Sequence, residues 1–335
     1  MQETYTDTNI TRRSSRRHAR QALLAGAVLA TALAAPSMVS AADTVVAPDP
    51  AADQITALDG TVVWVSGTFG DRTLMQRNAD GIAPVKGAPH ASTYRSIDLG
   101  RDSKNRLVLT YQRCGASACK TLTDNLKGKR SSFKRLTPGR CTLTTAPARW
   151  RTRTAFGLLC RKANNQIDDN RSGLYVKHGS GTIKRLPLPK DAKRFGVTNI
   201  ESVDLRGTEV AAVAADVYEY AFAQRTNGTG LRSIFAAASE GDSGQSAHGL
   251  ALGPGATMWA LTTSEHAGDP NRTILFEVAD ECYRTEALIN PPGPNQADGF
   301  RAIDLAVDGP TLYLVVPGTG IVTHEFTAPD MCRPV

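Results

Sequence analysis

The sequence lacks the short motifs that identify most enzymes and metalloproteins. None of its six cysteines forms a CxxC pair, and no histidine lies beside a cysteine at the spacing of metal ligands, so we expect no zinc site. The six histidines are scattered in the same way. Helical periodicity is almost absent, which argues against helical folds. We therefore expect neither a cofactor nor a metal, and the sequence indicates no catalytic residue.

Aromatic residues are scarce, at 6% of the chain. They do not alternate with basic residues as a single-strand stacking surface would require, so a nucleic-acid partner is not expected. Residues 241–244 (Gly-Asp-Ser-Gly), with His248 nearby, look like the nucleophile segment of trypsin-like proteases. A catalytic triad needs a fold to assemble it, and none of that kind is visible. The tetrapeptide is also an ordinary loop sequence between two repeats, which is how we interpret it.

The first forty residues have the order of a secretory signal. Arginines are concentrated at residues 12–20, and an alanine-rich apolar run follows from Ala22 to about Val39, ending in Ser-Ala-Ala before Asp43. We expect a cleaved signal peptide over residues 1–42 and a secreted, periplasmic or cell-envelope protein. An uncleaved anchor is the alternative, because the run approaches the roughly 20 residues that span a bilayer. Membrane contact is expected only in that case.

All six cysteines lie after the signal segment. An even count in an exported chain predicts disulfides. Two cysteines bracket a four-residue loop and should pair as a hairpin staple, and two others flank the first two strands of one repeat. The last two would tie the C-terminal tail to the fifth repeat. The predicted bridges are Cys114–Cys119, Cys141–Cys160 and Cys282–Cys332.

One pattern recurs along the chain: a short apolar strand, a polar turn and a second apolar strand. It is clearest over Ser96–Cys114 and returns near Ser202, Gly249 and Ala302, with a looser copy from Gln54. The second strands begin about every 45 to 55 residues, a period typical of four-stranded propeller blades. A single blade cannot bury both of its faces, so the repeats should stack around an axis.

This repeat resembles the blades of secreted bacterial β-propellers of the TolB-like or WD40-like kind. In those families an Asp/Gly turn joins an apolar first strand to a second strand of the form Leu-Val-Leu-Thr-Tyr, which stands here at 107–111. The six second strands, which begin near Val62, Leu107, Ala155, Val210, Met258 and Leu312, mark six repeats. They predict one all-β domain over residues 43–335, a propeller of six four-stranded blades, and the resemblance covers nearly all of that domain. The Trp-Asp and Gly-His pairs of WD40 repeats are missing, and Asp102–Asn105 replaces the usual turn. No functional residue is therefore transferred from those families.

The sixth repeat has three clear strands, and one strand candidate, Thr44–Ala47, precedes the first repeat. We expect that strand to complete the last blade and so join the two ends of the chain, because an open ring would leave blade faces exposed.

Three aspartates, Asp98, Asp204 and Asp304, occupy the same place in their repeats, just before the leucine of the first strand. Such carboxylates could line a central channel and bind a cation or polar ligand. They could equally bond to backbone N–H groups of the next blade. Repetition in three blades favours the structural role.

Charge is distributed unevenly along the chain. Residues 113–195 hold 20 Lys and Arg against 4 Asp and Glu, whereas residues 196–335 hold 7 against 18. If residues 149–153 form a strand, its three arginines share one face, with Trp150 on the other. The candidate surface for an anionic partner, here called the basic sector, comprises Lys127, Lys129, Arg130, Lys134, Arg149, Arg151 and Arg153. A solvated basic face without a partner is the alternative.

These observations favour an exported, non-catalytic binding or scaffold propeller whose basic sector contacts a protein or an anionic envelope polymer. The alternative is an envelope polysaccharide hydrolase or lyase acting at the central face of the propeller. Such an enzyme would need two carboxylates converging on a glycosidic bond, which only a structure can show.

Overall fold

The computed structural model describes residues 43–115, 118–133, 139–194, 196, 199–215, 219–236, 243–266, 269–279, 282–288, 302–327 and 333–334. The predicted signal peptide lies outside this part of the chain, so its cleavage stays a prediction. Within it, no helix has the length and apolar character needed to cross a membrane. Helical structure is limited there to α1 (Lys190–Arg194) and a single 3₁₀ turn, η1 (Pro254–Ala256).

Four sheets have the four- or five-stranded form of a propeller blade, and successive strands within each are antiparallel. The first of these sheets contains β2 (Ile55–Leu58), β3 (Thr61–Thr68), β4 (Asp71–Asn78) and β5 (Gly81–Pro84). The second contains β15 (Asn199–Arg206), β16 (Glu209–Ala215), β17 (Glu219–Arg225) and β18 (Arg232–Ala236), and the third contains β19 (Ser243–Leu252), β20 (Met258–His266), β21 (Asp269–Ala279), β22 (Cys282–Leu288) and β26 (Arg333–Pro334). The fourth contains β23 (Asp304–Asp308), β24 (Thr311–Val316), β25 (Gly320–His324) and β1 (Thr44–Ala47).

The other strands form one nine-stranded sheet in which β11 (Ala148–Trp150) lies beside β6 (Thr93–Arg101). These two strands are joined by a single parallel pair, Trp150 with Arg101. The described strands therefore make five sheets, so an all-β propeller is confirmed but six separate four-stranded sheets are not seen. The strands of this sheet are β6 (Thr93–Arg101), β7 (Leu107–Cys114), β8 (Cys119–Asp124), β9 (Arg130–Ser132), β10 (Cys141–Leu143), β11 (Ala148–Trp150), β12 (Arg153–Cys160), β13 (Gly173–His178) and β14 (Ile183–Arg185).

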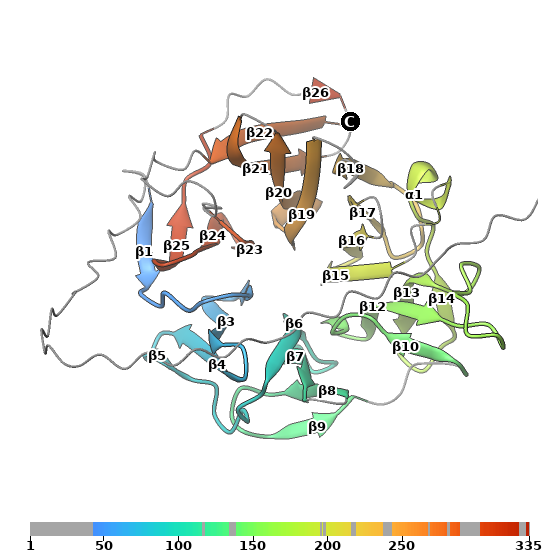
Figure 1. Cartoon of the computed structure of the whole chain (residues 1–335). Coiled ribbons are helices and arrows are strands. Elements are labelled where there is room, and N and C mark those ends of the chain that lie inside the picture. Colours follow the sequence, from blue (N-terminus) through green and yellow to red (C-terminus); the bar gives the residue numbers. More distant parts are fainter. Residues whose placement is uncertain are drawn as a thin grey trace, which may run out of the picture. The chain divides into compact units, whose positions relative to one another are not determined.

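The first and last parts of the propeller share one sheet, as expected. Strand β1 pairs antiparallel with β25, so the order is β1-β25-β24-β23. Strand β23 in turn contacts β2, which closes the sequence of sheets on itself (Figure 1). The predicted ring closure through Thr44–Ala47 is thus confirmed.

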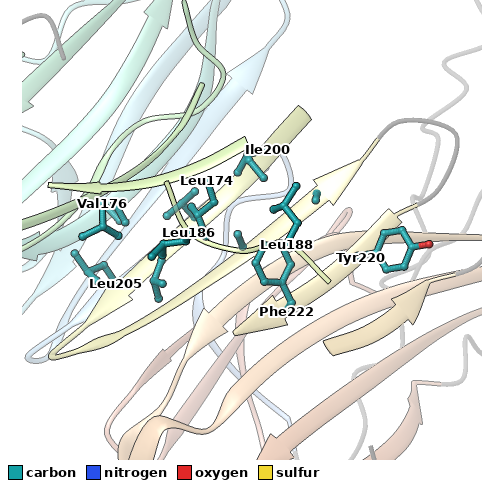
Figure 2. Close-up of a cluster of buried hydrophobic side chains, with 14 of the residues drawn as sticks. Leu174, Val176, Leu186, Leu188, Ile200, Leu205, Tyr220 and Phe222 are labelled. Atoms are coloured by element: carbon teal, nitrogen blue, oxygen red, sulfur yellow. The ribbon is translucent and has the colours of Figure 1, made fainter. Parts of the chain in front are cut away.

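The cores lie between neighbouring sheets. One cluster joins β12 and β13 to the sheet of β15–β18, with Leu174 and Val176 facing Ile200, Leu205 and residues of β17 (Figure 2). Similar clusters fill the next interfaces around the propeller. Because the central strands of each sheet have apolar residues on both sides, each sheet packs one of its faces against the preceding sheet and the other against the following sheet. Neither face of the sheet is therefore left exposed.

Two of the three predicted disulfides are present. Cys114 bonds to Cys119 across the β7–β8 hairpin, and Cys141 bonds to Cys160, directly opposite it on the β10–β12 pair. Cys282 is also disulfide-bonded. Its predicted partner, Cys332, lies outside the described residues, so that pairing stays a prediction.

Candidate functional site

The innermost strands of the propeller enclose a small polar cavity, here called the axial cavity. It has a volume of about 120 Å³ and is lined by residues of or beside β2, β6, β15, β19 and β23. Its polar lining includes Gln54, Arg95, Ser96, Asp98, Glu201, Ser202, Asp204, Arg206 and Asp304. The three recurring aspartates therefore do converge near the axis.

Each of these aspartates accepts a hydrogen bond from the inner strand of the next repeat. Asp98 Oδ2 accepts from the backbone N–H at the middle of β11 at 3.3 Å, Asp204 Oδ2 from the last residue of β19 at 2.7 Å, and Asp304 Oδ2 from the first residue of β2 at 2.9 Å. In the first repeat a threonine takes this place, since Thr56 Oγ1 accepts from the N–H of Leu99 at 2.9 Å. The structural role of the recurring aspartates is thus confirmed.

Burial changes the protonation of two of these carboxyls. Burial, and next the charge of Asp204, raise the pKa of Asp98 well above its usual value, although Arg206 opposes them. Burial likewise raises the pKa of Asp304 to about 8, with Asp53 adding to the effect and backbone N–H donors opposing it. Asp304 is therefore mostly protonated at neutral pH, and proton release from it would come only in alkaline solution.

A second, larger hollow lies between the first sheet and strands β7–β9; we call it the basic groove. It has a volume of about 1000 Å³. Its acidic lining residues are Asp80 and Asp102, and its cationic ones are Lys86, Arg106, Lys127, Lys129, Arg130 and Arg149. Two of these cations are held by protein carboxylates: Arg106 lies 2.6 Å from Asp102, and Arg130 lies 3.8 Å from Asp124.

The turn between β8 and β9 presents two of the lysines. Asn125 Oδ1 accepts hydrogen bonds from the backbone N–H groups of Lys127 and Lys129, both at 3.0 Å. Gly128 between them has φ +89°, a conformation that glycine adopts without strain. The turn is thus organised by its own asparagine and glycine, and it leaves both lysine side chains exposed.

Four members of the basic sector line the groove: Lys127, Lys129, Arg130 and Arg149. Lys134 lies outside the described residues. The first three come from one hairpin, whereas Arg149 reaches the groove from β11, some twenty residues later in the chain. The fold therefore brings together part of the sector that the sequence predicts.

Arg151 and Arg153 do not line the basic groove. The prediction that they share one face of a strand with Arg149 is wrong. Strand β11 ends at Trp150, a tight turn follows, and Trp150 pairs with Arg153 across the hairpin. Arg151 Nε donates to Asn105 Oδ1 at 3.1 Å, and Arg153 donates to a backbone carbonyl at the β15–β16 turn at 3.4 Å. The alternation of arginines gave no sign of this turn, because the turn contains neither glycine nor proline.

Sequence reasoning missed Lys86 and Arg106 of the groove. Lys86 follows β5 in the first sheet, and Arg106 ends the turn between β6 and β7. Both lie in a stretch of nearly balanced charge, so no local excess of basic residues marks them. Only the packing of the first sheet against β7–β9 places them beside the lysines.

Within the described residues, no group of three or more His, Cys, Asp or Glu side chains is placed to hold a metal ion. The protease-like tetrapeptide at 241–244 lies partly outside those residues, and the side chain of His248 does as well.

Comparison with known proteins gives likenesses of fold only. No family model matches the sequence. No curated protein matches it either. Among solved structures, virginiamycin B lyase from Staphylococcus aureus is 13% identical with a TM-score of 0.45, covering 84% of this chain and 97% of its own. The β-propeller domain of the Trilobed protease from Pyrococcus furiosus is 10% identical with a TM-score of 0.45, covering 83% of each chain. A protein of unknown function from Dyadobacter fermentans is 11% identical with a TM-score of 0.49, covering 84% and 97%.

These likenesses carry no argument about activity, because identities are low and every one of these TM-scores is below 0.5. The description of the chain as a propeller rests on its own sheets, on the closure through β1 and on the cores between sheets.

Proposed function

We propose that the protein is an exported, non-catalytic binding propeller that holds an anionic polymer of the cell envelope in the basic groove. The observation that carries the proposal is the convergence of six Lys and Arg side chains on one hollow between two sheets, whose described lining contains two acidic residues. A hollow of about 1000 Å³ is at the upper end of the size of ligand pockets.

The arrangement of charge supports binding of an extended ligand. Lys86, Lys127 and Lys129 are exposed, so they can follow charges spaced along a polymer without first breaking ion pairs. A concentration of one charge sign in a hollow attracts the opposite charge and speeds association. Because exposed charges are screened within about 8 Å at 0.15 M salt, binding should weaken as salt rises.

The axial cavity gives less support to the alternative, a polysaccharide hydrolase or lyase. Its volume of about 120 Å³ is well below the roughly 300 Å³ at which ligand pockets begin. Its aspartates also accept backbone hydrogen bonds from neighbouring strands. An aspartate side chain that holds two strands together cannot also be freely placed beside a glycosidic bond, so the geometry favours binding in the groove.

Export is part of the proposal. The mature protein would be a single domain, residues 43–335, released from a signal peptide at residues 1–42. Export is supported by the two disulfides, Cys114–Cys119 and Cys141–Cys160, because stable disulfides are typical of proteins in oxidising compartments. N-terminal sequencing of protein recovered from outside the cytoplasm tests this directly, and a retained N-terminus would contradict it.

We further propose that the nine-stranded sheet consists of two blades, β6–β9 and β10–β14, which makes six blades in all. The support is that β6 and β11 share one pair of residues, Trp150 and Arg101, whereas strands within each half share several. A crystal structure with a continuous ladder between β6 and β11 would contradict this division.

Binding to defined polymers tests the groove. Affinity is measured by calorimetry for polygalacturonate, linear polyphosphate and neutral dextran, each at 25 and 150 mM NaCl. Lys127→Glu with Lys129→Glu reverses two charges in the groove. Lys190→Glu with Lys193→Glu makes the same change of net charge on α1, where both lysines are exposed and neither lines the groove.

We expect the wild type to bind at least one anionic polymer and not dextran, more tightly at low salt. The groove variant should lose about tenfold or more in affinity, as removal of two charged contacts implies. The α1 variant should bind as the wild type does. Equal losses in both variants would show that net charge alone causes binding, and no binding to either anionic polymer would reject the proposal.

A further inference from the structure

Arg149 differs from the other arginines near it. Arg101 is paired with Asp59, and Arg106 with Asp102. Arg206 lies 3.5 Å from Asp204 and donates to the carbonyl oxygen of Ala57 at 2.7 Å. Arg149 and Arg206 both have an Nε atom that is buried without a hydrogen bond. Among the described residues, however, the Arg149 guanidinium has no hydrogen bond or ion pair through its other nitrogens either, whereas that of Arg206 has both. An arginine built into the wall of a groove therefore lacks the anion that its neighbours have.

An Arg149 guanidinium without a partner is energetically unfavourable in the protein without a ligand. Burial lowers the pKa of Arg149, an effect that the nearby carboxylate of Asp102 opposes. The guanidinium nevertheless stays charged at any physiological pH. Asp102 cannot satisfy it, because both oxygens of Asp102 accept hydrogen bonds within its own loop, from Arg106 and from the backbone N–H of Lys104. Arg149 is half-buried, and a charge that has lost part of its hydration without gaining a partner is unfavourable. An oxyanion that binds the guanidinium from the groove would offset part of this cost.

The backbone holds Arg149 in a fixed place. Its N–H donates to Asp98 Oδ2 at 3.3 Å, and its strand pairs with β12 on one side and β6 on the other. On the β6 side the approach is so close that a Cβ atom added to Gly100 would lie 1.9 Å from the carbonyl oxygen of Arg149. The main chain at Arg149 is thus already ordered before a ligand arrives, so binding has no cost of ordering the backbone there.

We propose that Arg149 is the anchor of the basic groove: its guanidinium binds one oxyanion of the polymer through two parallel N–H donors, while Lys127 and Lys129 contact charges further along it. The inference rests on the proposed function and adds the chemistry of recognition. A carboxylate and a phosphate both accept the planar fork of arginine in this way. The source is thus either a uronate-type sugar or a phosphate-bearing chain.

The experiment compares Arg149→Gln, Arg149→Lys and a matched control, Arg151→Gln. Arg151 lies on the same hairpin but outside the groove lining. Calorimetry at 150 mM NaCl measures affinity for galacturonate oligomers and for short linear polyphosphate, and thermal unfolding checks the fold. The Arg149 side chain has no hydrogen bond to described residues to lose, so the melting temperature of Arg149→Gln should equal or exceed that of the wild type.

We expect Arg149→Gln to weaken binding about tenfold or more, as loss of charge-assisted hydrogen bonds implies. Arg149→Lys should be weakened nearly as much, because an ammonium group cannot make the paired contact. Arg151→Gln should change the affinity by less than about twofold. The polymer that shows the larger Arg149 effect identifies the oxyanion.

The two proposals fail in different ways. If the wild type binds neither polymer, the proposed function is wrong and the anchor with it. If the wild type binds but Arg149→Gln binds equally well, the anchor is wrong and the groove proposal stands. Full affinity in Arg149→Lys would also overturn the anchor, since any cation would then suffice. If Arg149→Gln fails to fold, weakened binding by a fully folded Arg149→Lys supports the anchor.

Discussion

Replacing Asp304 by asparagine should change how stability depends on pH. The carboxyl has two backbone donors: Oδ2 accepts from the N–H of Ile55 and Oδ1 from that of Leu305, both at 2.9 Å. An asparagine has only one side-chain acceptor oxygen, so one of the two donors loses its partner. Below about pH 5 the variant should therefore be less stable than the wild type by about 1–3 kcal/mol.

The pH dependence follows from the pKa of Asp304, which burial raises from 3.8 to about 8. A group with a raised pKa contributes stability that is fully present below its unfolded pKa and is lost as pH rises through its folded pKa. Between pH 4 and 8 the wild type therefore loses stability relative to the variant. One pKa unit corresponds to about 1.4 kcal/mol, so the full shift sets an upper limit of about 6 kcal/mol. Asp304 keeps some contact with the axial cavity, and water there reduces the change, to about 1 kcal/mol per pH unit or less.

Urea unfolding at pH 5, 6, 7 and 8, followed by tryptophan fluorescence, measures this difference. Subtracting the free energies of unfolding of the two proteins at each pH cancels the contribution of groups that titrate alike in both. These groups include Asp98, whose pKa is also raised. Asp308→Asn is the control: its carboxylate accepts from the N–H groups of Asp59 and Gly60 at the surface. We expect the gap between the wild type and Asp304→Asn to shrink steadily as pH rises. A gap that is constant from pH 5 to 8, or that follows the Asp308 control, would refute the reasoning.

Three other changes test the fold and its link to the groove. Removing the Cys141–Cys160 bridge with paired alanine substitutions should lower the free energy of unfolding by about 2–4 kcal/mol, and an unchanged denaturant midpoint would contradict this. Gly100→Ala should clash with the carbonyl of Arg149 and lower the free energy of unfolding by about 1–3 kcal/mol. At temperatures where the variant is folded, it should also bind the polymer more weakly. Unchanged stability and binding would show that β11 can move. Deleting residues 43–47 removes β1 from its sheet and exposes the edge of β25, so the melting temperature should fall, and an equal value would contradict the closure.

The fold was predictable where its signal is local and repeated. The alternation of apolar residues, the recurring turn and the orphan strand Thr44–Ala47 all depend on short stretches of sequence, and each indicated a feature that the structure contains. The bridges Cys114–Cys119 and Cys141–Cys160 were predictable for the same reason, since their cysteines lie on adjoining strands of one hairpin or sheet.

The site was predictable only in part, because it depends on contacts between distant segments. Lys127 and Lys129 share one turn, so their proximity could be read from the chain. Arg149 meets them through the pairing of β11 with β6, and Lys86 through the packing of the first sheet. Arg151 was misplaced because a turn made of ordinary residues looks like a continuing strand. Spacing along the sequence does not encode these neighbours.

The role of the recurring aspartates shows how physical reasoning can separate two interpretations. Carboxylates repeated around an axis suggest a ligand site, but their place before the leucine of each inner strand also puts them beside the backbone of the next repeat. The hydrogen bonds of Asp98, Asp204 and Asp304 agree with the second interpretation. The threonine at position 56 makes the same bond without a charge, which indicates that an acceptor is what this place requires.

The most direct test of the basic groove is a site-resolved measurement of lysine protection. The protein is acetylated briefly with and without the anionic polymer it binds, and mass spectrometry compares the extent of modification at each lysine. Lys86, Lys127 and Lys129 line the groove, whereas Lys190 and Lys193 lie on α1, and all five are exposed. We predict that the polymer protects the three groove lysines and leaves the two on α1 unchanged. Equal protection at all five, or protection at α1 alone, would contradict the assignment of binding to the groove.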